Sequence, residues 1–282
     1  METQTGFQSG LEQLTAESVF EYYDQDRQEA LNSTQDIDNI LLKNERIILE
    51  SELRLQQRKR EFNTVFGQML LETLYGSAQY FNNQRILDNN HITGDLRTEL
   101  IIYQSKWLIW AIQAVKILSQ HNDQYSAQSI WNILESHSKE FSFNPNNAEI
   151  TKKGILGTII VWNVLENLGF NCYPPSYEED MRGLDLRAKK EHCKGLSVQV
   201  KTHCKNGRVG LPVFFRINQE YLDQIVDSPD YYSAKKLYIS SIINGTTPIM
   251  ACCSSQHSEK IDQATGAVDN SAMALCQNKI PS

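Results

Sequence analysis

The stretch RGLDLRAKKEHCKGLSVQVKTH, Arg182–His203, contains two short apolar segments on either side of a basic, polar connection. The segments LDLRA (184–188) and LSVQVKT (196–202) are rich in β-branched and leucine residues and have the length of ordinary strands. Together they predict a β-hairpin.

Side chains two residues apart on a strand face the same side. Gln199 and Lys201 therefore project together, while Val198 and Val200 face the core. Pairing of the two strands in a hairpin predicts that Asp185 lies beside Gln199. The alternative is an exposed cross-strand ion pair between Asp185 and Lys201, with Gln199 as an outward polar residue.

A carboxylate, an amide oxygen and an ammonium group in one place suit metal-assisted chemistry on a phosphate. Oxygen ligands hold Mg²⁺, so Asp185 and Gln199 are the predicted metal ligands. The metal lowers the pKa of a bound water and neutralises charge on the phosphate. Lys201 then orients or deprotonates that water, or steadies the phosphate as a point charge.

The charge distribution changes along the chain. Residues 1–150 carry 12 Lys and Arg against 21 Asp and Glu, whereas residues 151–282 carry 15 against 13. Residues 181–208 alone carry eight bases and two acids, a density that can follow a phosphate backbone or form a solvated loop. The candidate DNA-phosphate contacts are Arg187, Lys189, Lys190, His203, Lys205 and Arg208.

The first half of the chain has a helical pattern. Apolar residues recur at three-and-four spacing over 36–75, as one long helix or two, and further helices are predicted at 98–118 and 127–138. FSFNPNN (141–147) is typical of a linker. We therefore expect an α-helical domain at 1–145 that serves recognition, dimerisation or partner docking.

The second half mixes helices and strands. We expect a nuclease-like α/β domain with a mixed central sheet at 146–253, followed by a polar, flexible tail at 254–282. The whole chain is thus predicted to be α+β. The predicted helices are 150–168 and 219–226, and the predicted strands are 170–173, 184–188, 196–202, 211–217, 236–243 and 247–253.

The sequence leads us to expect an intracellular protein. No secretory signal opens the sequence, and the most apolar run, 100–118, is interrupted by Gln and Lys, so we expect a cytoplasmic protein without a membrane span. The six cysteines are then expected as reduced thiols. The doublets His192-Cys193 and His203-Cys204 lack the spacing of a zinc site.

At this point the residues carry a family resemblance. The order of elements resembles the PD-(D/E)xK, or restriction-endonuclease-like, nuclease superfamily. A helix and a strand are followed by GLDL (183–186) on one strand and VQVKT (198–202) on the next. The similar region, about 150–243, covers a third of the chain. The resemblance implies that Asp185 is the metal-binding acid, Gln199 the second acidic position and Lys201 the motif lysine.

Two features depart from the family pattern: no Pro precedes Asp185, and the usual carboxylate at the second acidic position is absent. The second acidic position is Gln199, which is similar to the end-cutting subunit of heteromeric transposases, some homing endonucleases and a few type II restriction enzymes. The change removes one negative charge from the metal site. Family members often add a Glu from the preceding helix, and here Glu166 is the candidate. The alternatives are Glu149, Glu178, Glu179 and Asp180.

The resemblance implies a Mg²⁺-dependent endodeoxyribonuclease, with Mn²⁺ as a substitute and DNA as the partner. A type II restriction endonuclease fits the size of the chain, and a homodimer would supply one active site for each strand. The alternatives are a transposon-end or homing-type endonuclease, and a non-catalytic DNA-binding or protein-binding protein with a degenerate nuclease fold.

Overall fold

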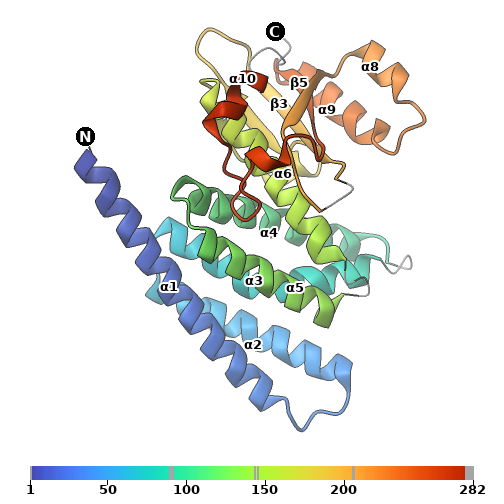
Figure 1. The fold of residues 1–282 in the computed structure, drawn as a ribbon. Helices are drawn as coiled ribbons and strands as arrows, with labels where there is room; N and C mark the ends of the chain where they lie inside the picture. The colour runs from blue at the N-terminus through green and yellow to red at the C-terminus, as the bar shows by residue number, and fades with distance from the viewer. Residues whose placement is uncertain (1, 89–91, 143, 145, 205–206, 277–282) are drawn as a thin grey trace. The chain divides into compact units, whose positions relative to one another are not determined.

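The computed structural model describes residues 2–88, 92–142, 144, 146–204 and 207–276. The chain divides into two compact units, Met1–Ala148 and Glu149–Ser282. Within the described ranges, every helix is too short or too polar to cross a lipid bilayer. The first unit is helical and the second carries the sheet (Figure 1), so the chain is α+β.

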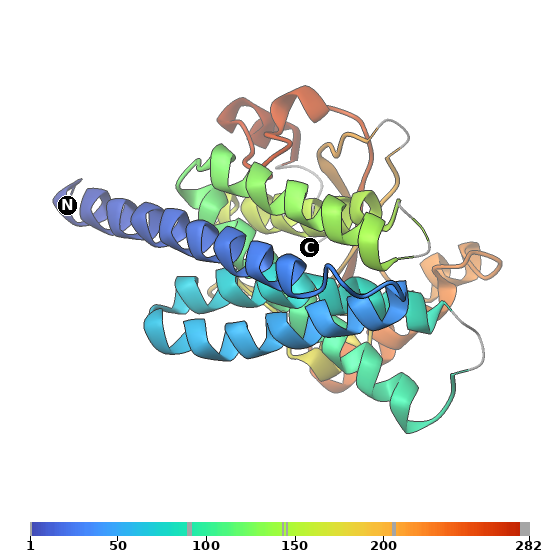
Figure 2. The same ribbon diagram turned by 90° about the horizontal axis from the view of Figure 1, so that it is seen from below.

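The helical unit is arranged around one central helix. Its elements are α1 (Glu2–Ser33), α2 (Ile40–Glu61), α3 (Val65–Leu87), α4 (Asp95–Gln120) and α5 (Gln124–Phe141). Helix α3 contacts the other four, and its Leu70, Leu71, Leu74 and Phe81 are fully buried. Helices α1 and α2 lie side by side, as Figure 2 shows from below.

The apolar pattern over 36–75 forms two helices and not one. The chain leaves helical geometry at Phe62, and Thr64 begins α3 by accepting a hydrogen bond from the Gly67 amide at 3.1 Å. A threonine in this capping position satisfies an amide that has no partner within the helix. The long helix α1 was not predicted, since its polar first residues carry little hydrophobic periodicity.

A buried histidine joins three helices of this unit. His137 of α5 is 2% exposed, and its Nε2 lies 2.9 Å from the Tyr23 hydroxyl and 2.5 Å from Arg27 Nη1. Its Nδ1 lies 2.6 Å from Ser77 Oγ, which itself donates to the Leu74 carbonyl. The ring therefore carries its proton on Nδ1 and accepts at Nε2. Burial, with the nearby Arg27 charge, holds the pKa of His137 well below its usual value.

We expect this histidine to make the helical unit sensitive to acid. Below about pH 6.5 the unfolded chain protonates His137 and the folded chain does not, so stability falls by up to about 1.4 kcal/mol per pH unit. We expect His137→Gln to remove this slope, measured by urea unfolding with tryptophan fluorescence between pH 5 and 7. The exposed His121 supplies the control His121→Gln. An unchanged slope in His137→Gln would assign the acid sensitivity to other groups.

The second unit is built on a mixed sheet. Among the described residues the sheet has five strands in the order β1-β2-β3-β5-β4. The strands are β1 (Asn171–Tyr173), β2 (Leu186–Lys189), β3 (Leu196–Thr202), β4 (Pro212–Arg216) and β5 (Thr247–Cys253). Neighbouring strands are antiparallel except for β3 and β5, which run parallel. The predicted hairpin is formed by β2 and β3, with Leu186 opposite Val198.

Helix α6 (Asn147–Asn167) packs on one face of the sheet at a glycine. A Cβ added to Gly157 would lie 2.3 Å from Thr202 Cγ2 and 3.4 Å from Val200 Cγ1, so only glycine allows this approach. The buried Cys253 thiol of β5 points to the Gly157 carbonyl at 3.9 Å. These contacts place Val200 and Thr202 on the α6 face, and Gln199 and Lys201 consequently lie on the opposite face.

Two glycines of α6 provide a matched test of this packing. Gly157→Ala forces the helix away from Thr202, and we expect a loss of about 1–3 kcal/mol in unfolding free energy. At Gly154 a Cβ meets nothing within 4 Å. Gly154→Ala should therefore stabilise the protein by up to about 1 kcal/mol through helix propensity alone. Urea unfolding of both variants checks the pair, and equal effects would contradict this contact.

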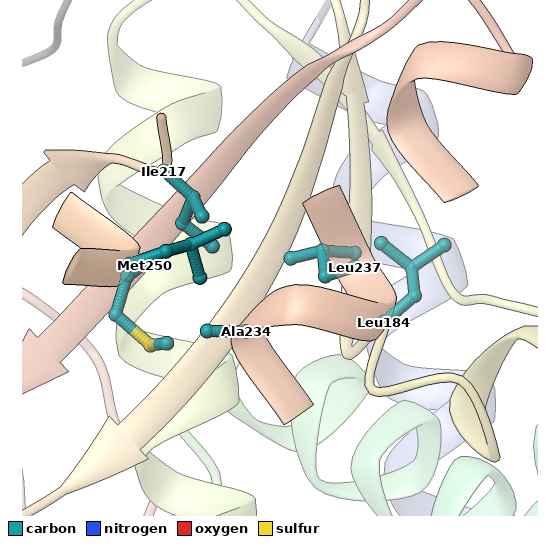
Figure 3. Close-up of a cluster of buried hydrophobic side chains, with 6 residues drawn as sticks. Leu184, Ile217, Ala234, Leu237 and Met250 are labelled. Carbon is teal, nitrogen blue, oxygen red and sulfur yellow. The ribbon is translucent and has the colours of Figure 1, made fainter. Parts of the chain in front are cut away.

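The opposite face of the sheet is covered by α8 (Gln219–Gln224) and α9 (Tyr231–Ile243). A cluster of buried hydrophobic side chains lies between these helices and the sheet (Figure 3). Its members are Leu184, Ile217, Leu222, Ala234, Leu237 and Met250. The predicted strand at 236–243 is wrong, because this segment is the second part of α9. Ala234, Leu237 and Ser241 are its buried residues and follow a helical period, whereas its isoleucines are mostly exposed and suggested a strand.

Residues 254–276, expected to belong to a flexible tail, are folded. They form η1 (Ser258–Lys260), η2 (Asn270–Ala272) and α10 (Met273–Cys276), and Ile261 bridges to Val268. The segment packs on α6, where the Gly266 carbonyl accepts a hydrogen bond from Asn163 at 2.9 Å. Small and polar residues suggested mobility, but here they make turns, such as the one in which Asp262 Oδ1 accepts from the amides of Ala264 and Thr265.

Candidate functional site

A tight turn at Gly183 precedes Asp185 in the chain. The short helix α7 (Tyr177–Asp180) ends in two hydrogen bonds, from the Gly183 amide to the Asp180 carbonyl at 2.8 Å and from the Leu184 amide to the Glu179 carbonyl at 3.1 Å. Gly183 has φ of +84°, a left-handed conformation that favours glycine. A Cβ at this position would also lie 2.8 Å from Gln199 Nε2. The glycine thus sets the chain direction and leaves room for Gln199.

Asp185 lies just before β2, in contact with the backbone of β3. Its amide donates to the Val198 carbonyl at 2.9 Å, and its Oδ2 accepts from the Val200 amide at 2.6 Å. Strand pairing between β2 and β3 begins only at Leu186. The carboxylate therefore takes the place of a strand carbonyl for Val200, and the hydrogen bond fixes its position near Gln199.

The carboxyl group of Asp185 is held in a poorly solvated place. Burial raises its pKa to about 7, the Val200 hydrogen bond opposes this rise, the Asp180 charge adds to it and the Lys201 charge opposes it. A carboxyl group with a pKa this high is costly to ionise at neutral pH unless a cation joins it. Strongly perturbed carboxyl groups of this kind are concentrated at functional sites.

Gln199 is a buried polar group of the site. The residue is 4% exposed, and its Oε1 is buried without a hydrogen-bond partner among the described residues. A buried carbonyl oxygen without a donor costs about 1–3 kcal/mol. Its neighbour across the parallel pairing is Met250, which belongs to the apolar cluster under α9. Gln199 thus presents an unused oxygen on the face where Asp185 lies.

Lys201 follows on the same face and is ion-paired. Its Nζ lies 3.1 Å from Asp230 Oδ1, with both side chains 27% exposed, and His203 Nε2 lies 3.9 Å from Asp230 Oδ2. Asp230 immediately precedes α9. The sequence reasoning missed Asp230 because the strand predicted at 236–243 concealed a helix N-terminus. An SPD sequence before an amphipathic period is the signal that would have revealed it.

Among the candidate additional acids, Asp180 is the one whose charge acts on the pKa of Asp185. The charges that act on Asp185 are those of Asp180 and Lys201. Glu166 is exposed on α6, where its Oε1 accepts from Trp162 Nε1 at 2.7 Å. Glu149 pairs with Lys153 at 3.3 Å on the same helix. The glycine turn after α7 therefore brings an acid to the site from the sequence just before Asp185.

The candidate phosphate contacts occupy different environments. Arg187 and Lys189 are exposed on β2, and Arg187 pairs with Glu179. Lys190 donates to the Leu168 carbonyl at 2.9 Å and lies over the Phe170 ring, which ties it to its own chain. His203 and Arg208 are exposed, and Lys205 lies outside the described residues.

The site holds one carboxyl group and one amide oxygen, both of the kind that bind hard cations. No group of three or more His, Cys, Asp or Glu side chains gathers anywhere in the described part of the chain. Mg²⁺, however, keeps several waters and needs only one or two carboxylates. A carboxyl group disfavoured by burial and a carbonyl oxygen without a donor are the kind of oxygen pair that a hard cation would satisfy.

Comparisons with protein-family models, with curated proteins and with solved structures gave no match to this chain.

Proposed function

We propose that this protein is a metal-dependent endonuclease that hydrolyses phosphodiester bonds in DNA. The observation that carries the proposal is two oxygen-bearing side chains of the β2–β3 hairpin: the half-buried Asp185, with a pKa of about 7, and the buried Gln199, whose Oε1 accepts no hydrogen bond from the described residues. Lys201 stands two residues further along the same strand face. The sequence resemblance to the PD-(D/E)xK superfamily agrees with these positions.

Each residue has a distinct task in this proposal. Asp185 and the Gln199 carbonyl hold Mg²⁺, for which Mn²⁺ can substitute. When bound, the metal supplies a water of lowered pKa and neutralises charge on the scissile phosphate. Lys201 acts as a positive charge that orients the attacking water or the phosphate, because the ion pair with Asp230 holds its ammonium in place.

The substrate is double-stranded DNA. Its phosphates contact the exposed basic side chains of β2 and of the segment after β3. A type II restriction endonuclease is the class that we propose first, acting as a homodimer with one site for each strand. A transposon-end or homing-type endonuclease is the alternative, since Gln199 resembles the variant position of those enzymes. The protein is proposed to work in the cytoplasm.

The function is tested by cleavage of supercoiled plasmid and of phage DNA with Mg²⁺ or Mn²⁺. We expect the wild-type protein to cut, and Asp185→Ala and Lys201→Ala to lose at least about 100-fold in rate, as for the loss of a group that stabilises developing charge. Lys236→Ala, at an exposed lysine of α9, is the control and should cut normally. A wild-type protein inert on every DNA and metal, or an active Asp185→Ala, would refute the proposal.

The pattern of products separates the classes of endonuclease. Discrete bands from wild-type protein alone support a restriction enzyme, and a neighbouring methyltransferase gene would agree with it. Cleavage that needs partner proteins supports a transposon-end enzyme.

One observation favours a second, non-catalytic candidate. The Val200 amide donates a hydrogen bond to Asp185 at 2.6 Å, so Asp185 gives this backbone group a partner whether or not it takes part in catalysis. In a degenerate nuclease fold that binds DNA or protein, Asp185 would be such a structural group. The stability of Asp185 variants separates the two roles.

A further inference from the structure

A cleft opens on the sheet face that carries Gln199, near the start of β3. Its volume is about 400 Å³, within the usual range for small-molecule sites. Residues of β1 and β2 form one side, and the segment that follows α9 forms the other. The residues that line the cleft include Tyr173, Arg187, Lys189, Ser197, Asn244 and Thr246.

Strand register aligns the cleft with the candidate metal site. Tyr173 stands opposite Arg187, and Arg187 stands opposite Ser197, so the three side chains form one row across β1, β2 and β3. Ser197 precedes Gln199 by two residues on the same strand face. Consecutive residues on one face are about 7 Å apart, so the row lies one step along the strands from Gln199.

Two cations of this cleft can hold a phosphate. Arg187 and Lys189 are two residues apart on β2 and face the same side. Arg187 is 54% exposed and uses Nη2 for its ion pair with Glu179, and its other N–H groups make no hydrogen bond to the described residues. Glu179 is fixed in turn, because its Oε2 accepts from the Ser176 amide at 3.0 Å. The guanidinium is therefore held toward the cleft, with donors left for an anion.

An aromatic ring and a group of hydroxyls complete the site. Tyr173, 53% exposed, is the cross-strand neighbour of Arg187 and offers its ring face for stacking. Ser197 Oγ of β3 lies 2.7 Å from Thr246 Oγ1 on the other wall, where Asn244 follows the last residue of α9. A stacking ring beside a pair of cations is the combination that binds single nucleotides without regard to base identity.

We infer that this cleft binds one unpaired nucleotide of the DNA strand that passes Asp185. The phosphate lies on Arg187 and Lys189, and the base stacks on Tyr173. The inference rests on the proposed nuclease function for the path of the strand, but binding itself requires neither the metal nor cleavage.

The test is a titration of full-length protein with deoxyadenosine 5′-monophosphate in EDTA, followed by ligand-observed NMR. Inorganic phosphate and deoxyadenosine are titrated separately. We expect Arg187→Gln to weaken binding of the nucleotide about tenfold or more. Tyr173→Leu should weaken nucleotide binding about tenfold and leave phosphate binding unchanged. Lys236→Gln, an exposed cation on α9 outside the cleft lining, should change neither.

Three outcomes would overturn the inference. They are no binding to the wild-type protein, an equal loss in Lys236→Gln and Arg187→Gln, and unchanged nucleotide binding in Tyr173→Leu, which would indicate a site for phosphate alone. Circular dichroism melts of each variant verify folding. Asp185→Ala, which should stop cleavage, must still bind the nucleotide. Loss of cleavage and loss of the cleft therefore remain separate results.

Discussion

Asp185→Asn should abolish DNA cleavage and, without metal, make the protein more stable than the wild type at pH 8. The variant keeps an oxygen for the Val200 amide and removes a carboxylate whose ionisation burial opposes. If replacing the carboxylate by an amide makes the protein more stable, the carboxylate is retained for function and not for folding.

The size and pH dependence of the gain follow from the raised pKa. In the unfolded chain Asp185 ionises near pH 4, whereas in the folded chain its pKa is about 7. Between these values the folded state binds the extra proton, so wild-type stability falls as pH rises from about 4 to 7. The loss amounts to at most about 4 kcal/mol. We expect Asp185→Asn to be about 2–4 kcal/mol more stable at pH 8 and nearly equal to the wild type at pH 4.

Urea unfolding across this pH range measures the effect, and hydrogen exchange of the peptide 196–202 assigns it to the C-terminal unit. Asp223→Asn, on α8, is the control and should leave the pH dependence unchanged. A less stable Asp185→Asn at pH 8 would instead support the structural role of Asp185 and the degenerate-fold candidate.

Gln199→Glu should have the opposite effect on the metal-free protein. A second carboxylate then shares a buried place with Asp185, and we expect a loss of about 2–4 kcal/mol at pH 8. The same change restores the negative charge that a divalent cation prefers, so Mg²⁺ should bind at least about tenfold more tightly. Urea unfolding with and without 10 mM Mg²⁺ would therefore show a larger metal-dependent gain than in the wild type.

Gln224→Glu, at an exposed position on α8, is the matched control for added charge. It should alter neither stability nor the response to Mg²⁺ by more than about 0.5 kcal/mol. Equal responses to Mg²⁺ in Gln199→Glu and Gln224→Glu would remove Gln199 from the metal site.

The central hairpin could be predicted because its information is local. Alternation over 196–202 fixed which side chains share a face, and the structure places Gln199 and Lys201 on the face opposite α6. Asp185 lies one residue before β2, held by the Gly183 turn and by Val200, which a strand pattern alone does not specify. The pairing of the two strands could therefore be predicted from the sequence, whereas the hydrogen bond between Asp185 and the Val200 amide could not.

The misread segments have physical causes. The buried residues of α9, Ala234, Leu237 and Ser241, recur at helical spacing. The exposed isoleucines of the same helix are β-branched residues, which are typical of a strand. Asp180, whose charge raises the pKa of Asp185, is the last residue of α7, and the turn at Gly183 then leads the chain to Asp185. Long-range pairings such as Lys201 with Asp230 depend on the packing of α9, which no local pattern reports.

Direct binding of Mn²⁺, followed by the loss of its free-ion electron paramagnetic resonance signal, tests the central claim most closely. The wild-type protein should bind Mn²⁺ at Asp185 and Gln199, Asp185→Asn should lose that binding, and Gln199→Glu should bind more tightly. A wild-type protein that leaves the free-ion signal unchanged, or an Asp185→Asn variant that binds as the wild type does, would contradict a metal site in this hairpin.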